Sequence, residues 1–397
     1  MTVPTSILVV GGSVGGLATV EALRRKGYSG RITVLGAEEH EPYDRPPLSK
    51  QVLAGDWGFD RVRLRRPEVL ARLDAEFLLG DAAVALDTAG RTVRTAAGWD
   101  LTADAVVIAT GTRPRELGIG PRPDGVLVLR TLDDAVALRT ALDSTRRLVV
   151  VGDGVLGAEV AATARTLGCQ VTLVGPLPAP MTLQFGDEVA RMLAALHIER
   201  GTVLRPGSGV VGWRTTDGRV SGVELDDGEV LAADTVLVAV GSVPNTEWLA
   251  GSGLDVTDGV QCDARCRAAD GIHAVGDVAR WHHRALGTSM RMENRTNAVE
   301  QAAVVAADIL GEDTEYTPVP YLWTDQYDAK IHTHGFLPTN ATMTVVDGDP
   351  AARRFVAEFR CDGRITGVLG WNMAKQARQH RQQVVDAMTF RQSLERS

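Results

Sequence analysis

The apolar and polar positions of the chain repeat one pattern twice. In the first copy, a run of β-branched and leucine residues occupies positions 7–10, an apolar pattern with helical spacing covers 17–26, and a second apolar run covers 32–35. This succession predicts a strand, a helix that ends at Gly27, and a second strand. The first copy is therefore one strand–helix–strand unit of about 30 residues.

The second copy predicts a strand over 148–151, a helix over 157–167 that ends at Gly168, and a strand over 171–174. In both copies a glycine-rich turn separates the first strand from the helix. The two turns read Gly11-Gly12-Ser13-Val14-Gly15-Gly16 and Gly152-Asp153-Gly154-Val155-Leu156-Gly157.

Turns of this kind bind pyrophosphate groups. Because glycine has no Cβ, backbone N–H groups and the N-terminus of the following helix can approach a phosphate closely. One copy is weak evidence, since any tight turn from strand to helix favours glycine. Two copies predict two dinucleotide sites. Ser13 stands at the middle glycine position of the first turn, where a serine still permits a close turn and its hydroxyl suits a phosphate.

Two further apolar strands predict where the chain crosses between domains. One, over 104–109, is broken by Thr110-Gly111, and the other, over 234–240, ends at Gly241. We expect the segment from about 113 to 243 to form an inserted domain. The chain then returns to a strand that ends in Gly276-Asp277, followed by a helix over 297–310.

The last part of the chain, from about residue 317, changes character. Apolar alternation predicts antiparallel strands at 344–346, 354–360 and 365–369, with turns at Asp347-Gly348 and Asp362-Gly363. A last helix is expected over 373–388. The whole pattern predicts an α/β protein with two Rossmann-like domains and a C-terminal α+β domain.

Composition and charge limit the possible partners. The 397 residues are 44% hydrophobic, enough for two or three domains with buried cores. The net charge of −8 and the pI of about 5.6 exclude the broad positive field that nucleic acid or an anionic membrane requires. The first residues carry no basic segment, and their apolar run stops at Gly11, too short for a signal or a membrane span. We therefore expect a cytoplasmic protein.

The cysteines and histidines give no clear metal or redox motif. The four cysteines include no C-x-x-C pair, and Cys262 and Cys266 are interpreted as small buried side chains rather than a redox pair. His332 and His334 share one face of a strand, as metal ligands sometimes do. Without a third ligand in the sequence, we predict no metal site.

The chain resembles a known family. It is similar, from about residue 5 to 388, to the FAD-dependent, NAD(P)H-using ferredoxin reductases that serve bacterial cytochromes P450 and ring-hydroxylating dioxygenases, within the pyridine nucleotide-disulfide oxidoreductase superfamily. The most specific matches are the segments 42–50, 272–277 and 321–327. The resemblance implies a FAD-binding domain formed by 1–112 and 244–316, an NAD(P)-binding domain over 113–243, and a C-terminal domain over 317–397.

The resemblance also implies site residues. Lys50 matches the family lysine beside flavin N5, where a cation stabilises the charge gained on reduction, and Glu159 matches the acid that pairs with it near the nicotinamide. Asp277 matches the acid that bonds a ribityl hydroxyl. Trp323, Asp325 and Gln326 match the stretch over the flavin edge. The residues implied to bind a cofactor are Gly11, Ser13, Gly15, Gly16, Glu38, Arg45, Lys50, Ala109, Thr110, Gly111, Arg113, Gly152, Gly154, Gly157, Glu159, Gly241, Gly276, Asp277, Glu293, Arg295 and Trp323.

Three departures from the family pattern change the expectations. Gly36 stands where an acid usually grips the adenosine ribose, with Glu38 two places on as a substitute. Gly175 stands at the equivalent place in the second unit, so neither NADH nor NADPH is positively selected, and we expect NADH on the family pattern alone, with NADPH possible. Arg295 replaces a frequent aromatic residue. Beside the flavin it would raise the reduction potential, and the alternative is an exposed residue at a helix start.

The expected reaction follows from the resemblance. The segment 45–50 carries no thiol where the disulfide reductases of the superfamily have a cysteine pair, so we expect hydride transfer from NAD(P)H to FAD and single-electron transfer to an iron–sulfur ferredoxin that feeds a P450 or a dioxygenase. The alternatives are an NAD(P)H oxidase or quinone reductase and, from another class, a flavin-binding interaction protein. We expect a monomer or homodimer. Candidate ferredoxin-docking clusters are Arg61, Arg63, Arg65 and Arg66, and Arg280, Arg284 and Arg291.

Overall fold

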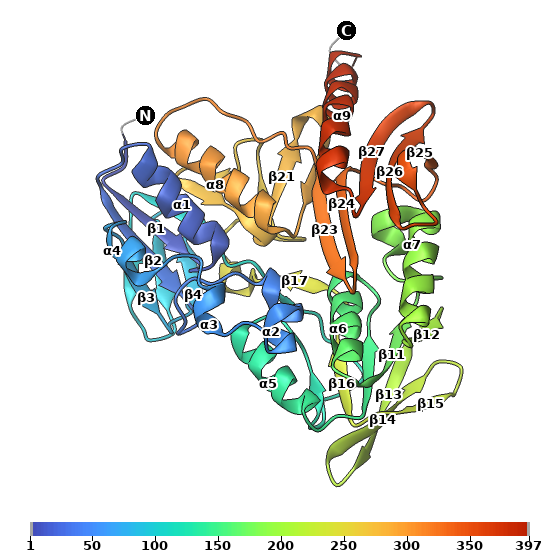
Figure 1. Cartoon of the computed structure of the whole chain (residues 1–397). Coiled ribbons are helices and arrows are strands. Elements are labelled where there is room, and N and C mark those ends of the chain that lie inside the picture. The colour runs from blue at the N-terminus through green and yellow to red at the C-terminus, as the bar shows by residue number, and fades with distance from the viewer. Residues whose placement is uncertain (1–2, 395–397) are drawn as a thin grey trace.

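The first glycine turn lies at the carboxyl edge of a six-stranded sheet (Figure 1). The computed structural model describes residues 3–394. Apart from the edge pair β19–β20, neighbouring strands are parallel. Helices α1 (Val14–Arg25) and α8 (Arg295–Ile309) lie side by side over this sheet. The strand order is β19 (Arg267–Ala269), β20 (Ile272–Ala274), β7 (Ala105–Ile108), β1 (Ser6–Val10), β2 (Arg31–Gly36) and β3 (Glu76–Leu79).

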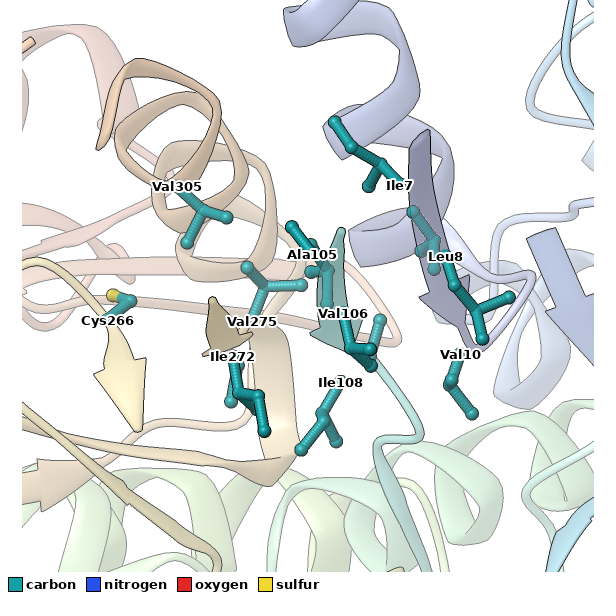
Figure 2. Close-up of a cluster of buried hydrophobic side chains, with 14 of the residues drawn as sticks. Ile7, Leu8, Val10, Ala105, Val106, Ile108, Cys266, Ile272, Val275 and Val305 are labelled. Atoms are coloured by element: carbon teal, nitrogen blue, oxygen red, sulfur yellow. The ribbon is translucent and has the colours of Figure 1, made fainter. Parts of the chain in front are cut away.

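The core of this first sheet is built from strands that are apolar on both faces. Ile7, Leu8 and Val10 of β1 belong to one buried cluster with Val106 of β7 and Val305 of α8 (Figure 2). Strands of a parallel sheet are usually covered on both faces, so they are continuously hydrophobic. The expected strand at 7–10 and its helix are confirmed.

Cys262 and Cys266 belong to the same core cluster, and both thiols are free. Burial raises the pKa of each thiol. The two side chains therefore have the character of small buried groups rather than of reactive thiolates.

A five-stranded parallel sheet carries the second glycine turn. The helix after this turn, α6 (Val155–Thr166), matches the predicted helix. Helices α5 (Leu132–Leu142) and α7 (Thr182–Glu199) pack against this sheet, and neither was predicted from the sequence. The strand order is β12 (Val203–Pro206), β11 (Gln170–Gly175), β10 (Arg147–Val151), β16 (Thr235–Val238) and β9 (Val126–Leu127).

The two crossing segments of the chain lie next to each other. Strand β8 (Thr112–Pro114) pairs antiparallel with β17 (Ser242–Pro244), so that Arg113 lies opposite Val243. The chain thus leaves the first sheet and returns to it through one two-stranded ribbon. Both of its strands follow directly on the turns at Gly111 and Gly241.

The C-terminal region is an antiparallel sheet with α9 (Ala374–Leu394) packed on it. Among the described residues the sheet has five strands, in the order β23 (Tyr321–Gln326), β24 (Ala329–Gly335), β27 (Arg364–Trp371), β26 (Arg354–Cys361) and β25 (Thr342–Asp349). In Figure 1, β23 extends from this sheet toward α6, and the two elements are in contact.

One of the two predicted turns in this sheet is correct and the other is wrong. Asp362 and Gly363 connect β26 to β27 with φ angles of 51° and 74°, as a tight hairpin turn requires. Asp347 and Gly348 instead lie within β25, where a bulge after Val345 keeps the strand paired as far as Asp349. The turn comes at 350–353, because a bulge absorbs one extra residue without ending the strand.

The remaining elements are short. Three small sheets contain β4 (Ala83–Asp87), β5 (Thr92–Thr95), β6 (Asp100–Thr102), β13 (Val210–Thr216), β14 (Arg219–Leu225), β15 (Val230–Ala232), β18 (Val260–Cys262), β21 (Ala279–His283) and β22 (Thr288–Arg291). The short helices are η1 (Pro46–Ser49), α2 (Gln51–Ala54), α3 (Phe59–Val62), α4 (Pro67–Ala71), η2 (Glu247–Leu249), η3 (Gly276–Val278) and η4 (Arg284–Leu286). None of the helices within residues 3–394 combines the length and the apolar character needed to cross a bilayer.

Candidate functional site

One cavity of about 1330 Å³ connects the two glycine turns. This volume exceeds the roughly 300–1,000 Å³ of a pocket that holds one small ligand, so there is room for more than one. The sheets direct their carboxyl edges toward it, which is where open α/β sheets bind nucleotides. The predicted residues that line it are Gly11, Ser13, Gly15, Glu38, Arg45, Lys50, Ala109, Thr110, Gly111, Arg113, Gly154, Glu159, Gly241, Gly276, Asp277, Glu293, Arg295 and Trp323.

The other three predicted glycines, Gly16, Gly152 and Gly157, are not among the residues that line the cavity in the described part of the chain. A Cβ at Gly16 would lie 1.9 Å from the carbonyl oxygen of Gly11, and a Cβ at Gly157 would lie 1.8 Å from that of Gly152. These glycines therefore let each helix pack tightly against its own turn. They shape the two turns without lining the cavity themselves.

Ser13 is compatible with the first turn because the middle position needs no special backbone conformation. Its φ of −89° resembles the −75° of Gly154 at the same place in the second turn. The Ser13 side chain caps no helix N–H, and Gly12, Val14 and Gly15 line the cavity beside it. The first N–H groups of a helix lack partners within the helix. The start of α1 thus fits the phosphates of a dinucleotide, as FAD binding requires.

Glu38 belongs to a polar cluster on the cavity wall. Its Oε2 accepts a 2.5 Å hydrogen bond from Tyr43, and its Oε1 forms a 2.6 Å ion pair with Arg45. Arg45 also donates to the Tyr43 hydroxyl and to the Arg130 carbonyl. Burial, above all, raises the pKa of Tyr43, so its hydroxyl stays protonated as a donor. The cluster fixes the orientation of the Glu38 carboxylate.

Lys50 and Glu159 form a buried ion pair on the wall of the cavity. Lys50 Nζ lies 2.7 Å from Glu159 Oε2, and their side chains are only 10% and 6% exposed. Ser49 donates a 2.6 Å hydrogen bond to the same carboxylate oxygen, and Thr324 donates a 2.8 Å hydrogen bond to Oε1. The pair joins the segment before α2 to α6, as the resemblance predicted. Sequence reasoning missed Ser49 and Thr324, although each is next to a predicted residue.

Trp323 on β23 faces the cavity, and its ring centroid lies 4.9 Å from Lys50 Nζ, a cation–π contact. Gln326 was expected over the flavin edge, and here the expectation is wrong. Its side chain is buried away from the cavity lining, donates to Thr324 Oγ1 at 3.1 Å, and bonds His197 Nε2 at 2.8 Å. Successive residues of a strand point to opposite faces, so Trp323 and Gln326 cannot share one.

Asp277 lines the cavity from the first turn of η3. Arg130 forms a 2.9 Å ion pair with its carboxylate, and the Gly276 N–H donates to Gln301 of α8. These contacts hold the Gly-Asp turn against the cavity. Arg130 was not predicted, because it follows an unrecognised two-residue strand, β9.

Three more predicted residues are held by ion pairs or hydrogen bonds. Arg113 pairs with Glu247, and Glu293 accepts from Ser242 at 2.5 Å. Arg295 is the first residue of α8 and is 44% exposed. It lies beside the cavity and forms a 2.9 Å ion pair with Asp44. Burial raises the pKa of Asp44, partly offset by Arg295.

His332 and His334 lie on one face of β24 and contact the same tyrosine. Tyr321 bonds His332 Nδ1 at 2.8 Å and stacks on His334. Burial, followed by Arg381 and Arg378, lowers the pKa of His334 to about 4. Within residues 3–394, no group of three or more histidine, cysteine, aspartate or glutamate side chains is arranged to hold a metal.

Two glycine turns on two parallel sheets, meeting in one cavity at a buried lysine–glutamate pair, define a protein of the two-dinucleotide oxidoreductase class. Comparison with known proteins agrees. The chain belongs to the pyridine nucleotide-disulphide oxidoreductase family, whose model matches residues 5–302, and residues 321–393 match the reductase C-terminal family.

Several of the similar proteins are ferredoxin reductases. The chain is 38% identical to a ferredoxin–NAD(+) reductase component of an anthranilate 1,2-dioxygenase system from Burkholderia cepacia, covering 93% of this chain and 91% of the relative. It is 35% identical to rhodocoxin reductase from Rhodococcus erythropolis, covering 92% and 86%. A crystal structure of a covalent putidaredoxin reductase–putidaredoxin complex superposes with a TM-score of 0.92 at 31% identity, covering 96% and 93%.

Proposed function

We propose that this oxidoreductase transfers electrons from NADH to a [2Fe–2S]-type ferredoxin, which in turn supplies a cytochrome P450 or a ring-hydroxylating dioxygenase. The observation that carries the proposal is the single cavity in which both glycine turns meet the Lys50–Glu159 pair. The relatives named above are ferredoxin reductases, which supports this acceptor. NADPH is the alternative donor.

Bound FAD would accept a hydride from the nicotinamide and release the electrons one at a time. The chain's own residues bind and orient the two nucleotides. The start of α1 would hold the FAD pyrophosphate, Asp277 would bond a ribityl hydroxyl, and the start of α6 would hold the pyrophosphate of the nicotinamide nucleotide. Lys50 would stabilise the negative charge that the flavin gains on reduction, and the ring of Trp323 contacts the Lys50 ammonium group.

Among the described residues that line the cavity there is no cysteine, and so no thiol that could relay electrons. This favours direct discharge from the flavin over a dithiol route.

The cluster of Arg61, Arg63, Arg65 and Arg66 supports ferredoxin docking better than the second cluster. Arg280, Arg284 and Arg291 are each paired with a carboxylate at 2.6–2.8 Å. In the first cluster, Arg63 and Arg65 are also paired, whereas Arg61 and Arg66 are exposed. The segment runs beside Pro42–Asp44 of the cavity wall, since Tyr43 bridges Arg63. We infer that an acidic ferredoxin docks here.

We further infer the domain division set out above, with 1–112 and 244–316 holding FAD, 113–243 holding the nicotinamide nucleotide, and 317–397 forming the third domain. The C-terminal domain contributes Trp323 and Thr324 to the site. A cytoplasmic location and a monomeric or homodimeric state remain predictions.

The test compares acceptors. FAD-loaded protein is reduced anaerobically with NADH and mixed with a panel of [2Fe–2S] ferredoxins, with dioxygen or with a quinone. The proposal predicts that at least one ferredoxin is reduced much faster than dioxygen or quinone. Faster transfer to dioxygen or quinone would make the protein an oxidase or quinone reductase. NADH binding without flavin reduction would leave only a flavin-binding interaction protein.

A further inference from the structure

The second glycine turn contains an acid, Asp153, whose side chain occupies the place left empty by Gly175. A Cβ built on Gly175 would lie 2.1 Å from both Cγ and Oδ2 of Asp153. Asp153 thus projects from the turn after β10 to the carboxyl end of β11. A side chain at position 175 and the Asp153 carboxylate could not be present together without movement.

The carboxylate is placed where an acid is chemically useful. In Rossmann-like units an acidic residue about 20 residues after the glycine turn, at the end of the second strand, accepts hydrogen bonds from the adenosine ribose. Gly175 occupies that place, and the following residues 176–181 contain no acid. Asp153 supplies a carboxylate to the same position from a different point in the chain, next to Gly154, which lines the cavity.

The first unit provides an internal comparison. Gly36 is the equivalent of Gly175, and Gly12 is the equivalent of Asp153. A Cβ on Gly12 would lie 3.8 Å from the Gly36 Cα, so the same two positions are neighbours there. In that unit the acid is Glu38, on the loop after the strand. The second unit has no such residue, and its acid is in the turn.

Asp153 is not neutralised by a cation. It is 8% exposed, and among the described residues no lysine or arginine pairs with it. Burial raises the pKa of its carboxyl, and the N–H groups of Asp153 and Leu177 act in the opposite direction. A carboxylate has lone pairs beyond those that two N–H groups use. Both ribose hydroxyls are donors, whereas a 2′-phosphate is an anion and an acceptor.

We propose that Asp153 determines nucleotide specificity, accepting hydrogen bonds from the ribose 2′- and 3′-hydroxyls of NAD(H) and disfavouring the 2′-phosphate of NADP(H). The assignment rests on the proposed function, in which the second turn holds the nicotinamide nucleotide. It identifies NADH as the donor from this chain's own residues.

The test measures binding of NAD⁺ and NADP⁺ to oxidised, FAD-loaded protein by isothermal titration calorimetry, which requires no turnover. We expect the native protein to bind NAD⁺ more tightly than NADP⁺. Asp153→Ala should weaken NAD⁺ binding about tenfold, because a hydrogen bond to a charged group is lost. It should also narrow the preference for NAD⁺ over NADP⁺. Asp153→Asn keeps the shape and should also narrow it. Asp187→Ala, an exposed acid on α7, is the matched control and should change neither affinity.

Gly175→Glu provides the complementary variant. As a single variant, Gly175→Glu should clash with Asp153 and weaken the binding of both nucleotides. In the double variant with Asp153→Ala, it should restore the preference for NAD⁺. An unchanged NAD⁺ to NADP⁺ affinity ratio in Asp153→Ala and Asp153→Asn would overturn the assignment and leave Asp153 a structural role in the loop after β11. That result leaves the proposed function standing. Failure of the native protein to bind either NAD⁺ or NADP⁺ would overturn both the Asp153 assignment and the proposed function.

Discussion

Lys50 Nζ lies 2.7 Å from Glu159 Oε2 although 109 residues separate them in the chain. The pair is buried between the segment that follows β2 and the helix that follows the second turn. Burying two charges is costly unless they are paired and further hydrogen-bonded. Ser49 and Thr324 provide those bonds. The site thus joins residues from both nucleotide-binding units and from the C-terminal sheet.

Lys50→Met should slow flavin reduction by NADH about 100-fold at saturating NADH, while FAD remains bound. The reason is the loss of a fixed cation at the place where negative charge develops, an effect of this order in other sites. Anaerobic stopped-flow absorbance measures the rate. Lys375→Met, an exposed lysine on α9, is the control. A Lys50→Met rate within twofold of the native rate would rule out this role.

Thr324→Val should destabilise the protein by about 1–3 kcal/mol, because it leaves a buried Glu159 oxygen without its partner and removes one hydrogen-bond acceptor of the Gln326 amide. Thr324→Ser keeps the hydroxyl and should recover most of the loss. Urea unfolding of the FAD-loaded protein measures the difference. If the Thr324→Val and Thr324→Ser variants had equal free energies of unfolding, the Thr324 hydrogen bond would contribute nothing to stability.

Arg295 and Asp44 should have opposite effects on the flavin midpoint potential. A positive charge beside the ring favours its reduced anionic form, and the ion pair currently offsets the Arg295 charge. Arg295→Trp should lower the potential and Asp44→Asn should raise it, each by about 30 mV, a tenfold change for two electrons. Spectroelectrochemical titration gives the values. No shift in either variant would place the pair outside the field of the flavin.

Stability should fall in acid partly because of His334. Its pKa is lowered to about 4 in the folded protein, mainly by burial, from an ordinary value of 6.5. Protonation therefore favours the unfolded chain, so the stability that His334 contributes is complete above pH 6.5 and is lost as the pH falls toward 4, up to about 3 kcal/mol. Denaturant unfolding of native protein and His334→Gln between pH 7 and about 4 should show a shallower decline for the variant. Parallel declines would contradict this.

Reduction of the ferredoxin should depend steeply on ionic strength, whereas reduction of the flavin by NADH should not, because only docking uses long-range charge. Replacing the exposed Arg61 and Arg66 by glutamate should reduce the salt dependence and slow ferredoxin reduction. The control replaces Arg31 and Arg146, which are exposed near the amino ends of β2 and β10. Equal effects of the two double variants would argue against docking at this cluster.

Local pattern was sufficient for the parts of the fold that repeat. Residues 7–10 and 148–151 are buried on both faces, so their strands are apolar throughout and easily found. Strand β9 has two residues and pairs with its neighbour β16, so no local signal indicated it, and Arg130 was missed with it. The β25 bulge depends on pairing with β26, which the sequence of β25 alone does not contain.

The site divides in the same way. Glycine turns and the residues next to them are local signals, and most predicted residues line the cavity. The partners of those residues are not local. Asp44 pairs with Arg295 across the chain, and the Asp153 carboxylate fills space at Gly175 only because β10 and β11 are neighbours. Gln326 was misplaced because its strand register, rather than its position in the segment, decides which face it takes.

The central claim is that one cavity holds FAD and the nicotinamide nucleotide in contact, and its most direct test is an anaerobic single-turnover experiment. Purified protein is loaded with FAD and mixed with excess NADH while the absorbance of oxidised flavin is followed. The account predicts stoichiometric FAD binding and rapid, saturable bleaching of the flavin. Protein that takes up no FAD, or that stays yellow with both NADH and NADPH, would contradict it.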